Sequence, residues 1–195
     1  SKCIIDGTGK APFQGAVVVE GEKIRYVGTN PPEVPGARVI DVKDDCVLPG
    51  LVDAHCHLTW CPLTAEHNAW FRRLPRIDRG EIYERYEWVD PQHQWAILAA
   101  MHMQTDLKIG VTTIRDVSEP NFIGVALKQA VEMGILTGPR ILIGGIGIRA
   151  GHGHGYNGQG FDGPAEIMKA VRQNLQAGAD LIKIYVSGAP TDIHT

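Results

Sequence analysis

The sequence predicts an α/β protein in which a β-rich segment precedes a parallel sheet. Two observations support this fold class. Residues 1–48 contain short strand patterns and turns but no helix pattern. From residue 47 onward, apolar strand patterns alternate with helix patterns in the order β-α-β-α-β-α-β. Such alternation indicates a parallel sheet, although the pattern alone leaves open whether that sheet is an open doubly wound sheet or a closed barrel.

The first 48 residues are expected to form about four short strands. The turn Gly21-Glu22 separates two of them and indicates a hairpin. Pro and Gly punctuate the loop before the last one. The expected strands cover residues 3–5, 15–20, 23–27 and 37–42.

The later elements are marked by helix start and stop signals. Asp90 followed by Pro91 is an N-cap with proline in the first turn. Gly110, Gly134 and Gly178 each follow a helix pattern as a C-terminal stop. The expected strands cover residues 47–58, 111–117, 140–144 and 181–186, and the expected helices cover 91–109, 121–133 and 164–177, with a further helix over 64–74.

Composition and charge exclude several classes of protein. The 195 residues carry a net charge of −3 without a cluster of Lys or Arg, so neither nucleic acid nor an anionic membrane is expected as a partner. No apolar run approaches the ~18–20 residues of a membrane span. The four cysteines lack a Cys-x-x-Cys spacing, which favours reduced thiols and a cytoplasmic protein.

A His-x-His pair ends the strand at residues 47–58. Side chains two apart on a strand share a face, so Asp53, His55 and His57 are expected on one face and Cys56 on the other. Two neutral imidazoles side by side can bind one divalent metal at about 2.0–2.1 Å each. The alternative is a polar strand end without a ligand.

Four segments together resemble the metal-dependent amidohydrolase superfamily. Leu-Pro-Gly-Leu-Val-Asp-Ala-His-Cys-His (48–57) resembles its first-strand signature. The segments 110–116, 138–140 and 178–183 resemble the following strands of its imidazolonepropionase-like and prolidase-like branch. The resemblance implies a (β/α)8 TIM barrel preceded by a small β-sandwich. It assigns residues 1–48 to part of the sandwich and residues 49–195 to the first half of the barrel, strands one to four.

The resemblance also implies a binuclear metal site. His55 and His57 would bind two divalent metal ions, with zinc expected, together with Lys183 carrying carbon dioxide as a bridging carbamate. The alternative for Lys183 is a stem packed inside with its ammonium in water. His152 and His154, in the glycine-rich loop after the third strand, and Arg115 at the end of the second strand are candidate substrate contacts. Arg115 could instead form a structural network with Asp116.

The implied reaction is hydrolysis of an amide or peptide-like C–N bond. Metal binding lowers the pKa of water from about 15.7 toward 7, and the hydroxide attacks a polarised carbonyl. The substrate would be a small molecule: a dipeptide, an N-acyl amino acid or a cyclic amide. The alternatives are a mononuclear deaminase on the same fold and a non-catalytic homologue or fragment acting in assembly. Substrate, metal and homo-oligomeric state stay open.

The family's catalytic Asp and two further His ligands are expected beyond Thr195. The 195-residue chain alone is therefore expected to be inactive and to aggregate, because two barrel edges would be unpaired.

Overall fold

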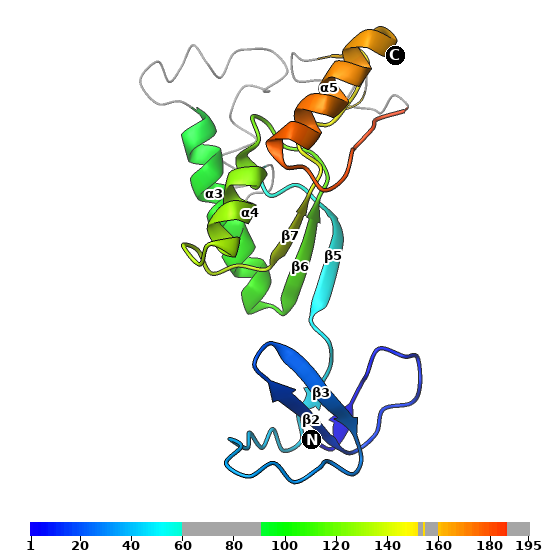
Figure 1. Ribbon diagram of the computed structural model, residues 1–195, viewed down its shortest axis with the longest axis vertical. Helices are drawn as coiled ribbons and strands as arrows, with labels where there is room; N and C mark the ends of the chain where they lie inside the picture. The colour runs from blue at the N-terminus through cyan, green and yellow to red at the C-terminus, as the bar shows by residue number, and fades with distance from the viewer. Residues whose placement is uncertain (60–90, 152–153, 155–159, 187–195) are drawn as a thin grey trace, which may run out of the picture. The chain divides into compact units, whose positions relative to one another are not determined.

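The chain forms two compact units in a computed structural model that describes residues 1–59, 91–151, 154 and 160–186. The first unit is Ser1–Gly50 and the second is Leu51–Thr195 (Figure 1). The expected helix over 64–74 lies outside the described residues.

The first unit is built from short strands. β1 (Cys3–Ile4) pairs in parallel with β4 (Cys46–Val47), and β2 (Ala16–Glu20) pairs antiparallel with β3 (Lys23–Gly28). The β2–β3 pair is the predicted hairpin, and the positive φ of Gly21 at its turn explains the glycine there.

The strand predicted over residues 37–42 is wrong. This segment is irregular, and the side chains of Val39 and Ile40 are 87% and 71% exposed. An alternating apolar pattern forms a strand only where a neighbouring strand accepts its hydrogen bonds and covers its apolar face. Within the described residues, no strand pairs with this segment.

The expectation that all four cysteines are reduced is also wrong. Cys3 and Cys46 form a disulfide, with their Cα atoms 4.6 Å apart. The parallel pairing of β1 with β4 places these two residues in register, which their spacing in the sequence does not reveal. Disulfides persist in oxidising compartments. The prediction of a cytoplasmic protein was based on reduced cysteines, so this disulfide removes its basis.

The second unit contains a three-stranded parallel sheet. Its strands are β5 (Leu51–Cys56), β6 (Val111–Asp116) and β7 (Arg140–Ile143), in the order β5-β6-β7. The helices α3 (Pro91–Lys108) and α4 (Ile123–Glu132) connect them and lie on the same side of the sheet (Figure 1). The α/β class and the parallel sheet are therefore as predicted.

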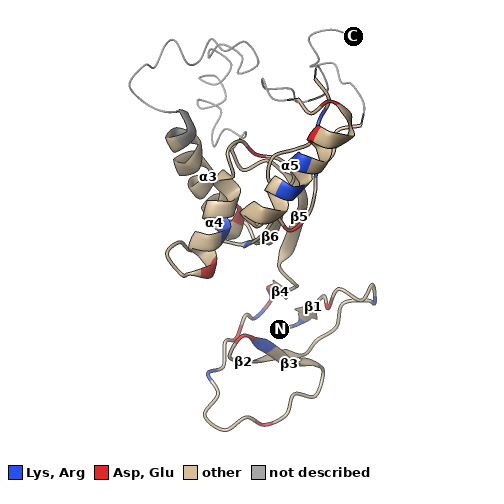
Figure 2. Ribbon diagram, turned by 45° about the horizontal axis from the view of Figure 1, so that its top comes forward, with Lys and Arg blue, Asp and Glu red and all other residues tan. Residues whose placement is uncertain are grey.

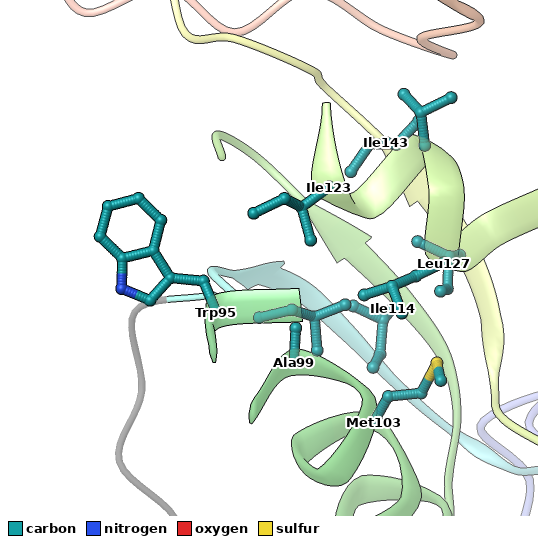
Figure 3. Close-up of a cluster of buried hydrophobic side chains, with 10 residues drawn as sticks. Trp95, Ala99, Met103, Ile114, Ile123, Leu127 and Ile143 are labelled. Carbon is teal, nitrogen blue, oxygen red and sulfur yellow. The ribbon is translucent and has the colours of Figure 1, made fainter. Parts of the chain in front are cut away.

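The core of this unit fills the space between the sheet and these two helices. Met103 and Ala99 of α3, Ile114 of β6 and Ile143 of β7 are fully buried. Figure 3 shows these side chains converging with others from α4. The labelled members of the cluster are Trp95, Ala99, Met103, Ile114, Ile123, Leu127 and Ile143.

The last of the described helices, α5 (Gly163–Ala177), holds the segment that follows β7. Its buried Asn174 donates from Nδ2 to the carbonyl of Ile146 (2.8 Å) and accepts from the amide of Ile146 at Oδ1 (2.9 Å). The solvent-facing side of α5 carries both acidic and basic residues (Figure 2). None of the described helices has the length and apolar character that a membrane crossing requires.

The fourth strand of the parallel series is much shorter than the predicted 181–186. It is a single parallel bridge between Ile148 and Ile184. The amide of Ile148 donates to the carbonyl of Lys183 (2.8 Å), and the amide of Tyr185 donates to the carbonyl of Ile148 (2.9 Å). The amides of Asp180 and Leu181 both donate to the carbonyl of Ile143 at the end of β7 (2.8 and 3.3 Å), so the start of this segment contacts β7 without forming a regular ladder.

Candidate metal centre

The two histidines of the His-x-His motif lie next to each other at the end of β5. The ring centroids of His55 and His57 are 5.7 Å apart, with the rings roughly perpendicular. The intervening Cys56 packs against the hydrophobic core on the helix side. The predicted separation of Cys56 from the two imidazoles is therefore confirmed.

Asp53 does not share the face of the histidines, contrary to the simple alternation. In the β5–β6 ladder, Asp53 pairs with Ile114 and Cys56 pairs with Asp116, so three steps along β5 match two along β6. This irregularity breaks the alternation. Asp53 accepts the amide of His55 at Oδ1 (3.0 Å), so it supports the strand end through the backbone.

His57 is held in one orientation by a hydrogen bond, and its surroundings disfavour the charged form of its ring. Its Nδ1 donates to the carbonyl of Ser118 (2.9 Å), which leaves Nε2 without the proton in the neutral ring. Burial lowers the pKa of His57, and the positive charges of Lys183 and Arg149 lower it further against the opposing effect of the Ser118 bond. A neutral imidazole with a carbonyl on its second nitrogen is a typical metal ligand.

The positive charge of Lys183 is close enough to His57 to lower the pKa of its imidazole. Its backbone is fixed by the bridge to Ile148, and its Nζ lies 4.8 Å from the ring centre of Tyr185. The side chain is half-buried and not enclosed. Lys183 is thus held beside the segment that follows β7, where its positive charge acts on His57 at the end of β5.

The ring of Tyr185 contacts two cationic side chains and one imidazole. The guanidinium of Arg149 lies 4.8 Å from the Tyr185 ring centre, and the side chain is only 3% exposed. The ring of His154 packs edge-on against Tyr185 at 5.2 Å. His154 and Lys183 thus both contact the Tyr185 ring, whereas His152 lies outside the described residues. Arg149 and Tyr185 were not singled out as site residues from the sequence, because contacts with them depend on the bridge at Ile148.

Arg115 supports the backbone of β5. Its side chain is exposed, and its Nε donates to the carbonyl of Ala54, within the irregular part of the strand. Asp116, the next residue, is fully buried and bonds elsewhere, so the alternative of a structural Arg115–Asp116 network is wrong. Adjacent residues on a strand point to opposite faces, which separates the two charges.

Two buried carboxyl groups lie at the end of β6 and just after it: Asp116, which with Arg115 was a candidate to orient a ligand, and Glu119, which the sequence did not single out. Asp116 accepts the amides of Leu58 (3.1 Å) and Ser118 (3.2 Å), and burial raises its pKa to about 7. Glu119 accepts the amide of Val125 (3.3 Å) and that of Gly124 at the start of α4. Burial, and secondarily the charge of Asp116, raises the pKa of Glu119 to about 8.

Comparison with known proteins identifies the family. Residues 46–193 match the model of the amidohydrolase family. The chain belongs to this family. An imidazolonepropionase of Idiomarina loihiensis is 31% identical to this amidohydrolase over 121 residues, which are 56% of this chain and 29% of that protein.

Solved structures resemble this amidohydrolase over almost its whole length. A Xaa-Pro dipeptidase with bound methionine superposes with a TM-score of 0.78 at 28% identity, over 98% of this chain and 47% of that one. A prolidase complexed with N-methylphosphonate-L-proline gives a TM-score of 0.72 at 28% identity, over 97% and 47%. The chain therefore spans about half the length of these structures.

The residues present fit part of a divalent metal site. Within the described residues, no three His, Cys, Asp or Glu side chains form a metal-binding group. His55 and His57 are two adjacent imidazoles, and the Ser118 carbonyl prepares the Nε2 atom of His57 for a ligand bond. Further ligands are needed to complete a tetrahedral shell.

Proposed function

We propose that this amidohydrolase is a metal-dependent hydrolase that cleaves an amide or peptide-like C–N bond. The observation that carries the proposal is the geometry of His57, whose ring is oriented by the Ser118 carbonyl and lies beside the ring of His55. Burial also lowers the pKa of His57, which favours the neutral form that binds a metal. The hydrogen bond and burial prepare an imidazole to bind a cation, whereas a polar strand end would need neither.

His55, His57 and Lys183 are the residues that would hold two divalent ions, with zinc expected. For this role the neutral amine of Lys183 attacks carbon dioxide, forming an N–C bond and losing a proton to solvent. The carbamate then offers two oxygens in the place of an ammonium. When bound, the metal ions supply Lewis acidity and hydroxide at neutral pH.

The placement of the helices favours a barrel over a doubly wound sheet. Both crossovers, α3 and α4, lie on the same side of strands that follow one another in order, and the Ile148–Ile184 bridge continues that order. A doubly wound sheet covers both faces with helices, whereas a barrel keeps them outside. We take residues 49–195 as the first half of a (β/α)8 barrel and residues 1–48 as part of a β-sandwich.

The substrate proposed is a small dipeptide, N-acyl amino acid or cyclic amide. The solved relatives support this class, since one is a Xaa-Pro dipeptidase holding methionine and another is a prolidase with a proline phosphonate. The imidazolonepropionase supports a cyclic amide. A mononuclear deaminase on this fold would have no use for a carbamate on Lys183, so removal of carbon dioxide from the buffer should leave its activity unchanged.

The test is hydrolysis of a panel of Xaa-Pro dipeptides and N-acyl amino acids by the purified full-length protein. We expect His57→Ala and Lys183→Ala each to lower kcat/KM by about 100-fold or more, because each removes a proposed ligand. His93→Ala, an exposed histidine on α3, is the matched control and should retain activity. Wild-type hydrolysis that survives both ligand substitutions and metal chelation would contradict the proposal.

A further inference from the structure

Ser118 uses both its backbone and its hydroxyl inside the candidate metal centre. The residue is 3% exposed and lies two positions after the end of β6. Its carbonyl accepts Nδ1 of His57 (2.9 Å), and its amide donates to Oδ1 of Asp116 (3.2 Å). Its Oγ accepts the amide of Gly147 and Nη2 of Arg149, both at 3.2 Å.

The two donors to the Ser118 hydroxyl flank Ile148, whose amide is hydrogen-bonded to the carbonyl of Lys183. Ile148 lies between Gly147 and Arg149, and its amide donates to the carbonyl of Lys183 (2.8 Å). The Ser118 hydroxyl is therefore one step removed from the backbone of Lys183, while its carbonyl touches the ring of His57.

Gly147 allows this contact because it has no side chain. A Cβ atom at this position would lie 2.6 Å from Oγ of Ser118 and 2.5 Å from Cε2 of Tyr185, both well inside van der Waals contact. The close approach of this segment to Ser118 thus depends on glycine. The buried Asp116 fixes the other side by accepting the amides of Ser118 and Leu58.

We propose that Ser118 is a positioning residue that couples the two ends of the metal centre, orienting His57 through its carbonyl and holding the Gly147–Arg149 segment, which pairs with Lys183, through its hydroxyl. This inference rests on the proposed function. It differs from a packing role because the hydroxyl and the carbonyl serve different ligands, and a substitution can remove one without the other.

The test compares Ser118→Ala with Thr105→Val in the purified full-length protein. Ser118→Ala removes the hydroxyl but keeps the carbonyl. Thr105→Val removes an exposed hydroxyl whose bond to the Met101 carbonyl stays within α3. Zinc affinity is measured by competition with a chromophoric chelator, and the carbamate on Lys183 by intact mass. The tautomer of His57 is read from the ¹⁵N shifts of its ring in the metal-free protein.

We expect Ser118→Ala to weaken zinc binding by about 10–100-fold, the usual effect of losing an outer-shell partner, and to lower the carbamate fraction. The Nδ1–H tautomer of His57 should be unchanged, and Thr105→Val should match the wild type in all three measurements. Wild-type zinc affinity in Ser118→Ala, or an altered His57 tautomer, would overturn the inference. A wild type that binds no zinc would contradict the proposed function, and the inference with it.

A measurement on the wild type alone covers the case in which Ser118→Ala does not fold. Zinc binding should slow hydrogen exchange of the Gly147 amide by about tenfold or more, because the amide donates to Ser118 and a bound Lys183 would hold its segment in place. If the exchange rate of this amide is the same with and without zinc, the inference is wrong.

Discussion

At the scale of single residues, Glu119 makes the stability of the fold depend on pH. Its carboxyl group is buried beneath the start of α4, and its pKa rises from 4.5 to about 8. The folded state therefore holds a proton between about pH 5 and pH 8 that the unfolded state has released. The stabilisation is complete below the unfolded pKa and is lost as the pH rises through the folded pKa.

We expect the free energy of unfolding of the metal-free protein to fall between pH 5 and pH 8, with Glu119 contributing up to about 1.4 kcal/mol per pH unit. Glu119→Gln mimics the protonated form and should flatten this slope, leaving the part due to Asp116. Urea titrations at a series of pH values measure the effect. Glu132→Gln is the control, since Glu132 is an exposed glutamate at the end of α4. Parallel pH profiles for wild type and Glu119→Gln would contradict this reading.

Some features of the site follow from the spacing of residues along the sequence, and others depend on contacts between separate strands. The adjacency of His55 and His57 follows from their spacing, and Cys56 faces the core as predicted. The roles of Ser118 and Arg149 could not be predicted, because they depend on which residues meet across separate strands. Asp53 was misplaced because the irregular β5–β6 register carries no mark in the sequence.

At the scale of elements, the packing of α3 on the parallel sheet contributes to the stability of the second unit. Met103 on α3 is completely buried in the cluster of Figure 3, whereas Met101 on the same helix is 47% exposed. Truncation of a buried methionine leaves a cavity, but truncation of an exposed one leaves little.

We expect Met103→Ala to destabilise the protein by about 2–5 kcal/mol and Met101→Ala to change its stability by no more than about 0.5 kcal/mol. Chemical denaturation of the two variants under the same conditions measures the difference. Equal losses of stability would show that α3 does not pack on the sheet through the Met103 face.

The elements that were predicted well are those with their own start and stop signals. The helices α3, α4 and α5 were expected within two residues of their observed ends, because Pro91 and the terminal glycines mark them. The strands over 37–42 and 181–186 failed or shortened because a strand also needs a neighbour. An alternating apolar pattern shows that a segment could form a strand, but it does not show which strand would pair with it.

At the scale of the whole molecule, the described residues present two histidines and a lysine at one end of an open parallel sheet. These residues supply imidazole nitrogens and an amine, which cover only part of a binuclear shell. The family match and the solved relatives, of which the chain spans about half, support the proposed metal-dependent hydrolase. The proposed carbamate on Lys183 would separate a binuclear site from a mononuclear one.

The most direct measurement is native mass spectrometry of the purified full-length protein, with Lys183→Met as the matched variant. We predict two divalent metal ions per chain and an additional mass of about 44 Da on the intact chain, that of carbon dioxide bound as the Lys183 carbamate. Both should be lost in Lys183→Met. A wild-type chain without metal, or with its metal content and mass unchanged by Lys183→Met, would contradict the assignment of Lys183 to the metal centre.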